Sequence, residues 1–394
     1  ANALARLGVQ RSDRVATLAW NGYRHMELYY AVSGSGAVLH TLNPRLHPDQ
    51  VVWIADHAED SVLFFDLTFL PLIAAVASRT KTVRHWVAMT DRAHLAKAVP
   101  AEMAAKIPNL LAYEDLVDAE HDRFVWPSFD ENTASSLCYT SGTTGNPKGV
   151  LYSHRSTVLH AYAAATPDAL NCGAADTILP VVPMFHVNAW GLPYIGCMVG
   201  AKLVFPGAGL DGKSLYELFE SEGVTLSAGV PTVWQGLLAH VEANGLRFST
   251  MKRTIIGGSA CPPAMIRAFA EKFDVHVLHA WGMTEMSPLG TVCSFKGRHA
   301  GLSQEDRYAV MAKQGRAIYG VDMKVVDENG AELPFGSEAS GDLLVRGPWI
   351  LETYFKGEGG DPLQRDADGH GWFPTGDVAK IDADGYMQIT DRSK

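Results

Sequence analysis

Cysteine is scarce in this chain of 394 residues, and its five copies follow no recognisable pattern. They lie far apart, without a CxxC pair or a spacing to histidine that suits a metal, which disfavours both disulfides and a zinc site. Scattered thiols of this kind are typical of a reducing compartment, so we expect a cytoplasmic protein.

Long, uninterrupted apolar runs are also absent. The most apolar stretch, residues 178–205, contains three prolines, a histidine and an asparagine, so it does not predict a membrane span. Basic charge is in deficit as well, because 33 lysines and arginines stand against 43 aspartates and glutamates, for a net charge of −10. Nucleic acid is therefore disfavoured as the main partner, since phosphate neutralisation needs a basic face. A local basic pocket for a nucleotide stays open.

The hydrophobic share of 47% is large enough for sizeable cores, and the length predicts two or three domains. Short β-branched runs such as 14–20 and 61–66 alternate with amphipathic stretches such as 231–243 through the first three quarters of the chain. This alternation predicts parallel α/β layers. After about residue 315 short strand patterns predominate, and Asp384-Gly385 indicates a hairpin turn. We therefore expect an α/β fold that ends in a small β-rich subdomain.

The segment Tyr139–Val150, with the sequence YTSGTTGNPKGV, carries the clearest chemical signal. Its three glycines allow the backbone to approach a polyanion, and its hydroxyls and Lys148 supply donors and one positive charge. Successive N–H groups in such a loop form an anion-binding nest. The spacing is not that of a Walker A loop, because position 147 is proline. A plain flexible turn is the less favoured alternative for so dense a loop.

This segment resembles the signature phosphate loop of the adenylate-forming superfamily, which includes acyl-CoA synthetases, nonribosomal peptide synthetase adenylation domains and beetle luciferases. Four further stretches agree in the same order: PMFHVNAW at 183–190, GGSACP at 257–262, AWGMTE at 280–285, and TGD at 375–377 followed by ITDRSK at 389–394. The resemblance covers essentially the whole chain. PMFHVNAW and the segment GAVLHTLNPRL at 36–46 are most similar to bacterial medium- and long-chain fatty acyl-CoA synthetases, including the methylmercaptopropionate-CoA ligase type.

The resemblance implies the large N-terminal part of such an enzyme, with two doubly wound α/β subdomains and a small distorted β-barrel-like subdomain. We expect residues 1–135 to form the first part of the α/β subdomains and 136–314 the phosphate-loop and acyl-binding region. Residues 315–394 would form the β-rich subdomain that ends at the hinge. We also expect the natural N-terminus to be clipped, and the small C-terminal lid domain, with the family's catalytic lysine, to be absent.

The implied activity is that of an acid-thiol ligase that uses ATP, Mg²⁺ and CoA. A carboxylate attacks the α-phosphate of ATP and expels pyrophosphate, and the CoA thiol then attacks the acyl-adenylate. The protein neutralises charge on the phosphates and holds two anions in line. The expected partners are a small carboxylic acid, ATP and CoA, and formation of a homodimer stays open.

By the same resemblance, the nucleotide-binding residues fall into groups. The phosphates are bound by Thr140, Ser141, Gly142, Thr143, Thr144, Gly145 and Lys148. Gly258, Ser259 and Ala260 form one wall of the adenine pocket, and Trp281, where tyrosine is commoner in the family, stacks on adenine and is followed by Gly282 and Met283. Thr284 contacts the α-phosphate, and Asp377 and Arg392 contact the ribose. A structural Asp–Arg pair is the alternative for Arg392.

Mg²⁺ is expected to be bound by the Thr140 hydroxyl and Glu285, because this hard ion prefers oxygen ligands. The catalytic residues would be Lys148, Thr284, Glu285 and His186, of which His186 lies near the substrate carboxylate. A surface carboxylate is the alternative for Glu285, and a satisfied core histidine is the alternative for His186.

Trp190 matches the bulky residue that gates the acyl tunnel of long-chain enzymes. Val230, Pro231 and Trp234 are further candidates for the wall of the acyl pocket, although structural packing is the preferred interpretation for these three, because aromatic residues at helical spacing are usually core.

Three functions stay open from the sequence. The first is a ligase for fatty or fatty-like acids. The second is a ligase for a short functionalised acid such as 3-methylmercaptopropionate. The third is a nucleotide- or acyl-binding paralogue without ligase activity, which the intact phosphate loop and the retained ligand residues disfavour.

Overall fold

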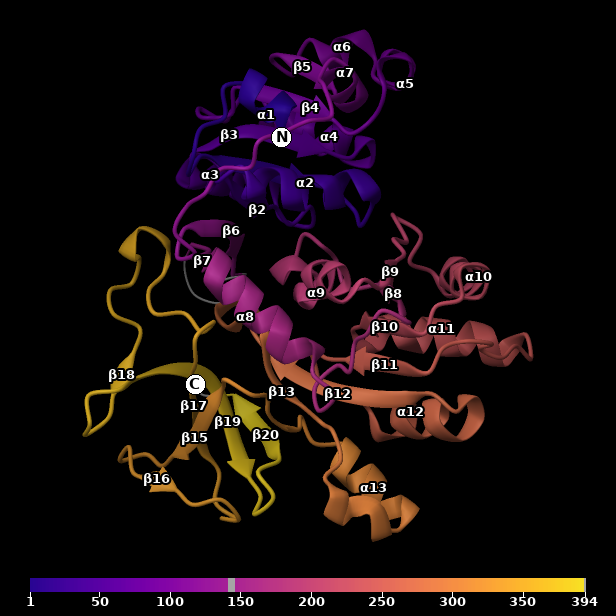
Figure 1. The fold of residues 1–394 in the computed structure, drawn as a ribbon, viewed down its shortest axis with the longest axis vertical. Coiled ribbons are helices and arrows are strands. Elements are labelled where there is room, and N and C mark those ends of the chain that lie inside the picture. Colours follow the sequence, from indigo (N-terminus) through magenta and orange to yellow (C-terminus); the bar gives the residue numbers. More distant parts are fainter. Residues whose placement is uncertain (141–145, 393–394) are drawn as a thin grey trace. The chain divides into compact units, whose positions relative to one another are not determined.

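The chain forms two compact units in the computed structural model, which describes residues 1–140 and 146–392 (Figure 1). The first unit contains residues 1–155 together with the returning segment 183–188. The second contains residues 156–182 and the chain from Ala189 onward. Among the described residues, no helix has both the length and the apolar character that a membrane crossing requires.

The first unit is built around one seven-stranded sheet in the order β5-β4-β3-β1-β2-β6-β7. All neighbouring strands are parallel except β6 and β7, which are antiparallel. The strands are β1 Arg14–Leu18, β2 Val38–Thr41, β3 Asp60–Phe65, β4 His85–Ala88, β5 Leu110–Ala112, β6 Ala134–Tyr139 and β7 Gly149–Ser153. The helices of this unit are α1 Asn2–Arg6, which precedes β1, and α2 Tyr23–Gly34, α3 Pro48–Ala58, α4 Leu70–Val76, α5 Arg92–Ala98, α6 Ala101–Ala104 and α7 Tyr113–Asp118.

The central strands of this sheet are buried on both faces, which explains their continuous apolar runs. Every residue of β3 is buried. The helices begin where the sequence supplies start signals: α3 has Pro48 in its first turn, and the His47 side chain caps it. A first-turn proline fits because its missing N–H would have no intrahelical partner.

The second unit contains another seven-stranded sheet, in the order β14-β13-β12-β11-β10-β8-β9. Strands β9, β8, β10, β11 and β12 are parallel, and β13 and β14 continue the sheet in antiparallel fashion. The strands are β8 Thr177–Pro180, β9 Lys202–Leu203, β10 Leu226–Gly229, β11 Arg253–Ile256, β12 His276–Gly282, β13 Leu289–Val292 and β14 Arg316–Ala317. The helices are α8 His154–Ala165, which begins at the end of the first unit, α9 Leu192–Val199, α10 Gly212–Glu222, α11 Pro231–Ala243, α12 Pro263–Arg267 and α13 Gln304–Met311.

A third, wholly antiparallel sheet closes the second unit. It runs in the order β16-β15-β17-β19-β18, with β20 also paired to β19, and is drawn in ochre and yellow in Figure 1. Its strands are β15 Asp322–Val326, β16 Glu332–Leu333, β17 Gly341–Arg346, β18 Gln364–Arg365, β19 Gly371–Ile381 and β20 Met387–Arg392. The expected turn between β19 and β20 is present, with Gly385 at φ 85°. Two sheets of mainly parallel strands followed by a small antiparallel sheet confirm the predicted fold class.

Candidate functional site

The two ends of the phosphate loop meet in the first unit, where β6 ends and β7 begins. The Thr140 N–H donates to the Lys148 carbonyl at 2.9 Å, and the Lys148 N–H donates to the Thr140 hydroxyl at 3.3 Å. These two bonds bring the Thr140 hydroxyl and the Lys148 backbone together at the base of the loop. Residues Ser141, Gly142, Thr143, Thr144 and Gly145 lie outside the described residues.

The segment 183–188, which contains His186, is held within the first unit by buried polar contacts. The Met184 N–H donates to the side-chain oxygen of Asn21 at 2.6 Å, and Tyr29 donates its hydroxyl proton to the Met184 carbonyl. The Asn188 amide donates to the Ser136 hydroxyl at 2.9 Å. The His186 side chain is exposed in this unit, so the arrangement presents an imidazole on a fixed backbone.

The backbone beyond His186 turns in a left-handed sense for several consecutive residues. Val187, Asn188, Ala189 and Trp190 have φ values of 39°, 53°, 48° and 58°, and Gly191 follows at 80°. For residues other than glycine this conformation costs about 1–2 kcal/mol each. Strain of this kind clusters at ligand sites, where the surrounding structure maintains it. The observation supports a functional role for the segment that carries Trp190.

Within the second unit, the Trp190 ring lies against the glycines that follow β11. A Cβ atom on Gly257 would lie 3.2 Å from a carbon of the Trp190 ring and 2.9 Å from the Ala280 carbonyl oxygen. A Cβ on Gly258 would lie 3.1 Å from Val230, the residue that precedes α11. Because Gly257 and Gly258 have no side chains, there is space beside them for the half-buried side chains of Trp190 and Val230.

Three predicted binding segments leave the sheet of the second unit at the same edge. β10, β11 and β12 are parallel, with Gly229 opposite Ile256 and Ile256 opposite His279. The segments 230–231, 257–260 and 282–285 follow the carboxyl ends of these strands and therefore lie side by side. Ligands of open α/β sheets bind outside this edge. Gly258, Ser259 and Ala260, which are predicted to form a wall of the adenine pocket, are exposed there.

The turn after β12 holds Glu285 in a defined position. A Cβ on Gly282 would lie only 1.9 Å from the Pro288 carbonyl oxygen, so this close approach requires glycine. The Met283 N–H donates to that same carbonyl at 3.1 Å. Residues Thr284–Met286 form a short 3₁₀ turn in which Thr284 is half-buried and Glu285 is only 8% exposed.

A tyrosine that the sequence did not single out contacts Glu285. Tyr354 donates its hydroxyl proton to the Glu285 Oε1 at 2.9 Å. Burial, with the Glu285 charge in addition, raises the pKa of Tyr354 well above its ordinary value. The phenol therefore remains protonated and acts as a donor. No local sequence pattern predicts this contact, because the partners are 69 positions apart.

Asp377 is buried on β19 and has two partners. The Trp281 indole N–H donates to its Oδ2 at 2.9 Å, and the Arg392 guanidinium lies 3.0 Å from its Oδ1. Its side chain is only 4% exposed, whereas that of Arg392 is 77% exposed. Burial raises the pKa of Asp377, and the Trp281 hydrogen bond and the Arg392 charge oppose that rise. Trp281, predicted as an adenine-stacking residue, thus also orients the predicted ribose carboxylate.

Trp234 and Pro231 begin α11, but Trp234 points into the core. It is fully buried, its indole N–H donates to the Gly229 carbonyl at 3.1 Å, and its ring packs against Phe219 and Phe269. This surrounding favours the packing interpretation that the sequence already preferred. Pro231 is buried beside it in the first turn.

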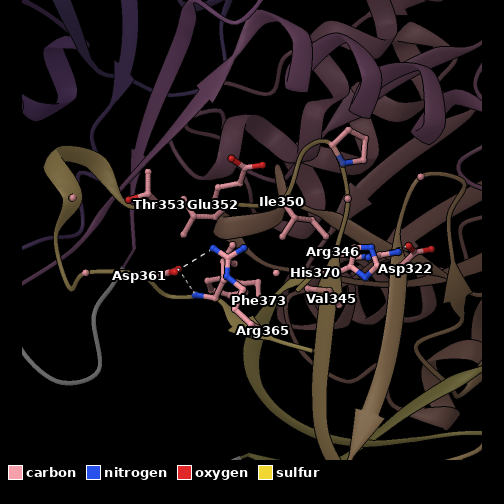
Figure 2. Close-up of a pocket in the computed structure, with 18 residues that line it drawn as sticks. Asp322, Val345, Arg346, Ile350, Glu352, Thr353, Asp361, Arg365, His370 and Phe373 are labelled. Atoms are coloured by element: carbon pink, nitrogen blue, oxygen red, sulfur yellow. Dashed lines mark hydrogen bonds and ion pairs between the residues drawn. The ribbon is translucent and has the colours of Figure 1, made fainter. Parts of the chain in front are cut away.

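A cavity of about 830 Å³ lies in the C-terminal sheet region, apart from the predicted site residues. Figure 2 shows two ion pairs in its lining: Arg346 lies 2.9 Å from Asp322, and Arg365 lies 3.2 Å from Asp361. Glu352 adds a third carboxylate to the same lining. One wall, residues 350–353, belongs to the loop that leads to Tyr354.

A model of the family described as AMP-binding enzymes matches residues 1–355. The chain is 53% identical, over its full length, to a 3-methylmercaptopropionyl-CoA ligase from Ruegeria lacuscaerulensis and to a medium-chain-fatty-acid–CoA ligase from Ectopseudomonas oleovorans, of which it covers 71% and 70%. A crystal structure of the anthranilate CoA ligase AuaEII with anthranoyl-AMP has the same fold, with a TM-score of 0.83 at 23% identity, over 99% of this chain and 70% of that one.

Fold, motif order and relatives agree on one class. The chain belongs to the family of AMP-binding enzymes.

Proposed function

We propose that this protein is an AMP-forming acid–CoA ligase that activates a fatty or fatty-like acid as its acyl-adenylate and then transfers the acyl group to CoA. The observation that supports the proposal is the arrangement of the second unit, which carries several of the residues predicted to bind the nucleotide. The carboxyl edge of β10, β11 and β12 presents an exposed backbone at 258–260. The adjoining Trp281 hydrogen-bonds the buried Asp377.

Each of these groups has a task that suits its chemistry. A buried carboxylate such as that of Asp377 can accept hydrogen bonds from both hydroxyls of a ribose. Gly258, Ser259 and Ala260 offer a flat wall to adenine, with Gly282 and Met283 beside Trp281. The Lys148 ammonium and the loop amides offset phosphate charge, Thr284 contacts the α-phosphate, and His186 contacts the acid.

The residues present also fit Mg²⁺ as a cofactor of the reaction. Thr140 and Glu285 both supply oxygen atoms, the ligand type that Mg²⁺ prefers. When bound, the ion would offset charge that develops on the phosphates. Glu285 is held in a buried turn, which suits a ligand that must keep its orientation.

The acid is proposed to be a medium- or long-chain fatty acid, with Trp190 and Val230 at the acyl pocket. A second candidate, 3-methylmercaptopropionate, is favoured by the equal 53% identity to ligases named for the two kinds of acid. Pocket depth decides between them, and one methylene contributes only about 1–3 kcal/mol to discrimination.

Pyrophosphate exchange by the full-length protein, with a panel of acids, tests both the reaction and the identity of the acid. The panel contains saturated acids of increasing length and 3-methylmercaptopropionate, compared by kcat/KM. Acid-dependent exchange is expected, with a maximum at one chain length. Absence of exchange with every acid, despite ATP binding, would favour the paralogue without ligase activity.

We further propose that the protein acts in the cytoplasm. We also propose that residues 1–135 form the first part of the α/β subdomains, 136–314 the phosphate-loop and acyl-binding region, and 315–394 the β-rich subdomain. A homodimer is a prediction that sedimentation of the purified protein would test.

A further inference from the structure

We propose that Tyr354 is a positioning residue for the metal-binding carboxylate, and that its hydroxyl fixes the orientation in which Glu285 meets Mg²⁺. The inference rests on the proposed function, because Glu285 is a metal ligand only in that proposal. The contact that carries it is the 2.9 Å hydrogen bond from the Tyr354 hydroxyl to the Glu285 Oε1.

The loop that carries Tyr354 is attached to the Glu285 turn at several points. The Leu351 N–H donates to the Glu285 carbonyl at 2.8 Å, and the Ser287 hydroxyl donates to the Trp349 carbonyl at 3.0 Å. The Trp349 indole N–H donates to the Leu289 carbonyl at 3.2 Å. These three bonds involve only backbone carbonyls as acceptors, so they hold the two segments together without constraining the Glu285 carboxylate.

The Tyr354 bond differs from these three because it ends on the carboxylate itself. The last torsion of a glutamate is a broad rotor with little intrinsic preference, and a donor on one oxygen selects its orientation. Donors in this position around metal ligands typically change metal affinity or activity by about 10–100-fold when they are removed.

Tyr354→Phe removes only the hydroxyl and keeps the three hydrogen bonds that attach the loop to the Glu285 turn. Tyr308→Phe is a matched control: Tyr308 is 5% exposed, and its hydroxyl has no hydrogen-bond partner among the described residues. Glu285→Gln is the third variant, because its amide oxygen still accepts from Tyr354 while the charge is lost.

The experiment measures the dissociation constant of ATP by calorimetry, once with EDTA and once with excess Mg²⁺. The ratio of the two constants reports the contribution of the metal. We expect this ratio to fall by about tenfold or more in Tyr354→Phe and in Glu285→Gln, and to stay unchanged in Tyr308→Phe. ATP affinity in EDTA and the melting temperature should stay close to wild type in Tyr354→Phe. The Mg²⁺ concentration for half-maximal pyrophosphate exchange should rise in parallel.

The outcomes separate the two levels of inference. If Tyr354→Phe keeps the wild-type ratio while Glu285→Gln loses it, Glu285 binds the metal without help from Tyr354, and the inference is wrong. If Glu285→Gln also keeps the ratio, the metal role in the proposed function fails. An equal loss of affinity with and without Mg²⁺ in Tyr354→Phe would identify Tyr354 as a support of the loop alone.

Discussion

The indole N–H of Trp281 donates a hydrogen bond to the buried carboxylate of Asp377, at 2.9 Å and across 96 positions of sequence. It joins the end of β12 in the second α/β sheet to β19 in the C-terminal sheet. Two residues that would each contact the nucleotide are thereby oriented by one another.

Replacing Trp281 with phenylalanine should weaken nucleotide binding and destabilise the fold. The aromatic face remains, but Asp377 loses a donor, and a hydrogen bond to a charged group contributes about 1.5–3 kcal/mol. The free energy of unfolding should fall by that order, and calorimetry should give a higher Kd for ATP. Trp86→Phe is the control, because Trp86 is fully buried and its indole nitrogen has no hydrogen-bond partner among the described residues. Unchanged ATP affinity in Trp281→Phe would contradict the orienting role.

Asp377→Asn should lower the affinity for ATP, and its effect on the stability of the fold should depend on pH. The pKa of Asp377 is raised above 3.8 by burial, so its protonated form is favoured by folding. This contribution to stability is present at low pH and is lost as the pH rises through the raised pKa. Asparagine cannot ionise and avoids that loss.

The melting temperature of Asp377→Asn relative to wild type should therefore increase from acidic to neutral pH, while ATP affinity falls at neutral pH. Thermal scans at several pH values and calorimetry measure the two effects. A pH-independent difference in melting temperature would mean that the Asp377 charge is fully compensated in the folded protein.

Lys148→Ala should slow adenylation far more than it lowers stability. The backbone of Lys148 closes the phosphate loop against Thr140, and alanine keeps both bonds. Loss of a group that stabilises developing charge typically costs about 10²–10³ in rate. Pyrophosphate exchange measures the rate, and Lys213→Ala on the exposed face of α10 is the control. Normal exchange in Lys148→Ala would remove this lysine from the phosphate site.

Trp190→Ala should shift acid preference toward longer chains with only a small loss of stability. Its ring is half-buried and lies against Gly257, so its removal opens space beside the proposed acyl pocket. Trp234→Ala is the contrasting variant, because a fully buried tryptophan should lose about 3–5 kcal/mol of unfolding free energy without changing the preference. kcat/KM across a chain-length series and chemical denaturation measure the two properties. A large destabilisation by Trp190→Ala with an unchanged acid preference would make Trp190 a packing residue.

Much of the site could be predicted from the sequence because its determinants are local. The phosphate loop and the glycines at 257, 258 and 282 are short-range requirements of turns and close backbone approaches. The α/β pattern also predicted parallel layers, and the structure places 230–231, 257–260 and 282–285 after three successive parallel strands, at one edge of the sheet.

The contacts of the tryptophans could not be predicted in this way. The motifs suggested a role for Trp190 and Trp281 and favoured packing for Trp234, but none of them identified the partners of the three rings. One lies on a left-handed turn against Gly257, one is enclosed by Phe219 and Phe269, and one donates to Asp377.

The sequence by itself determined the family, the order of the motifs and the chemistry that each motif can supply. Only the tertiary structure decided which side chains donate hydrogen bonds to the two buried carboxylates: Trp281 to Asp377, and Tyr354 to Glu285. The physical reason is that a hydrogen bond requires two atoms to lie about 3 Å apart at a suitable angle. Partners 69 and 96 positions apart reach that geometry only when the two sheets of the second unit have packed.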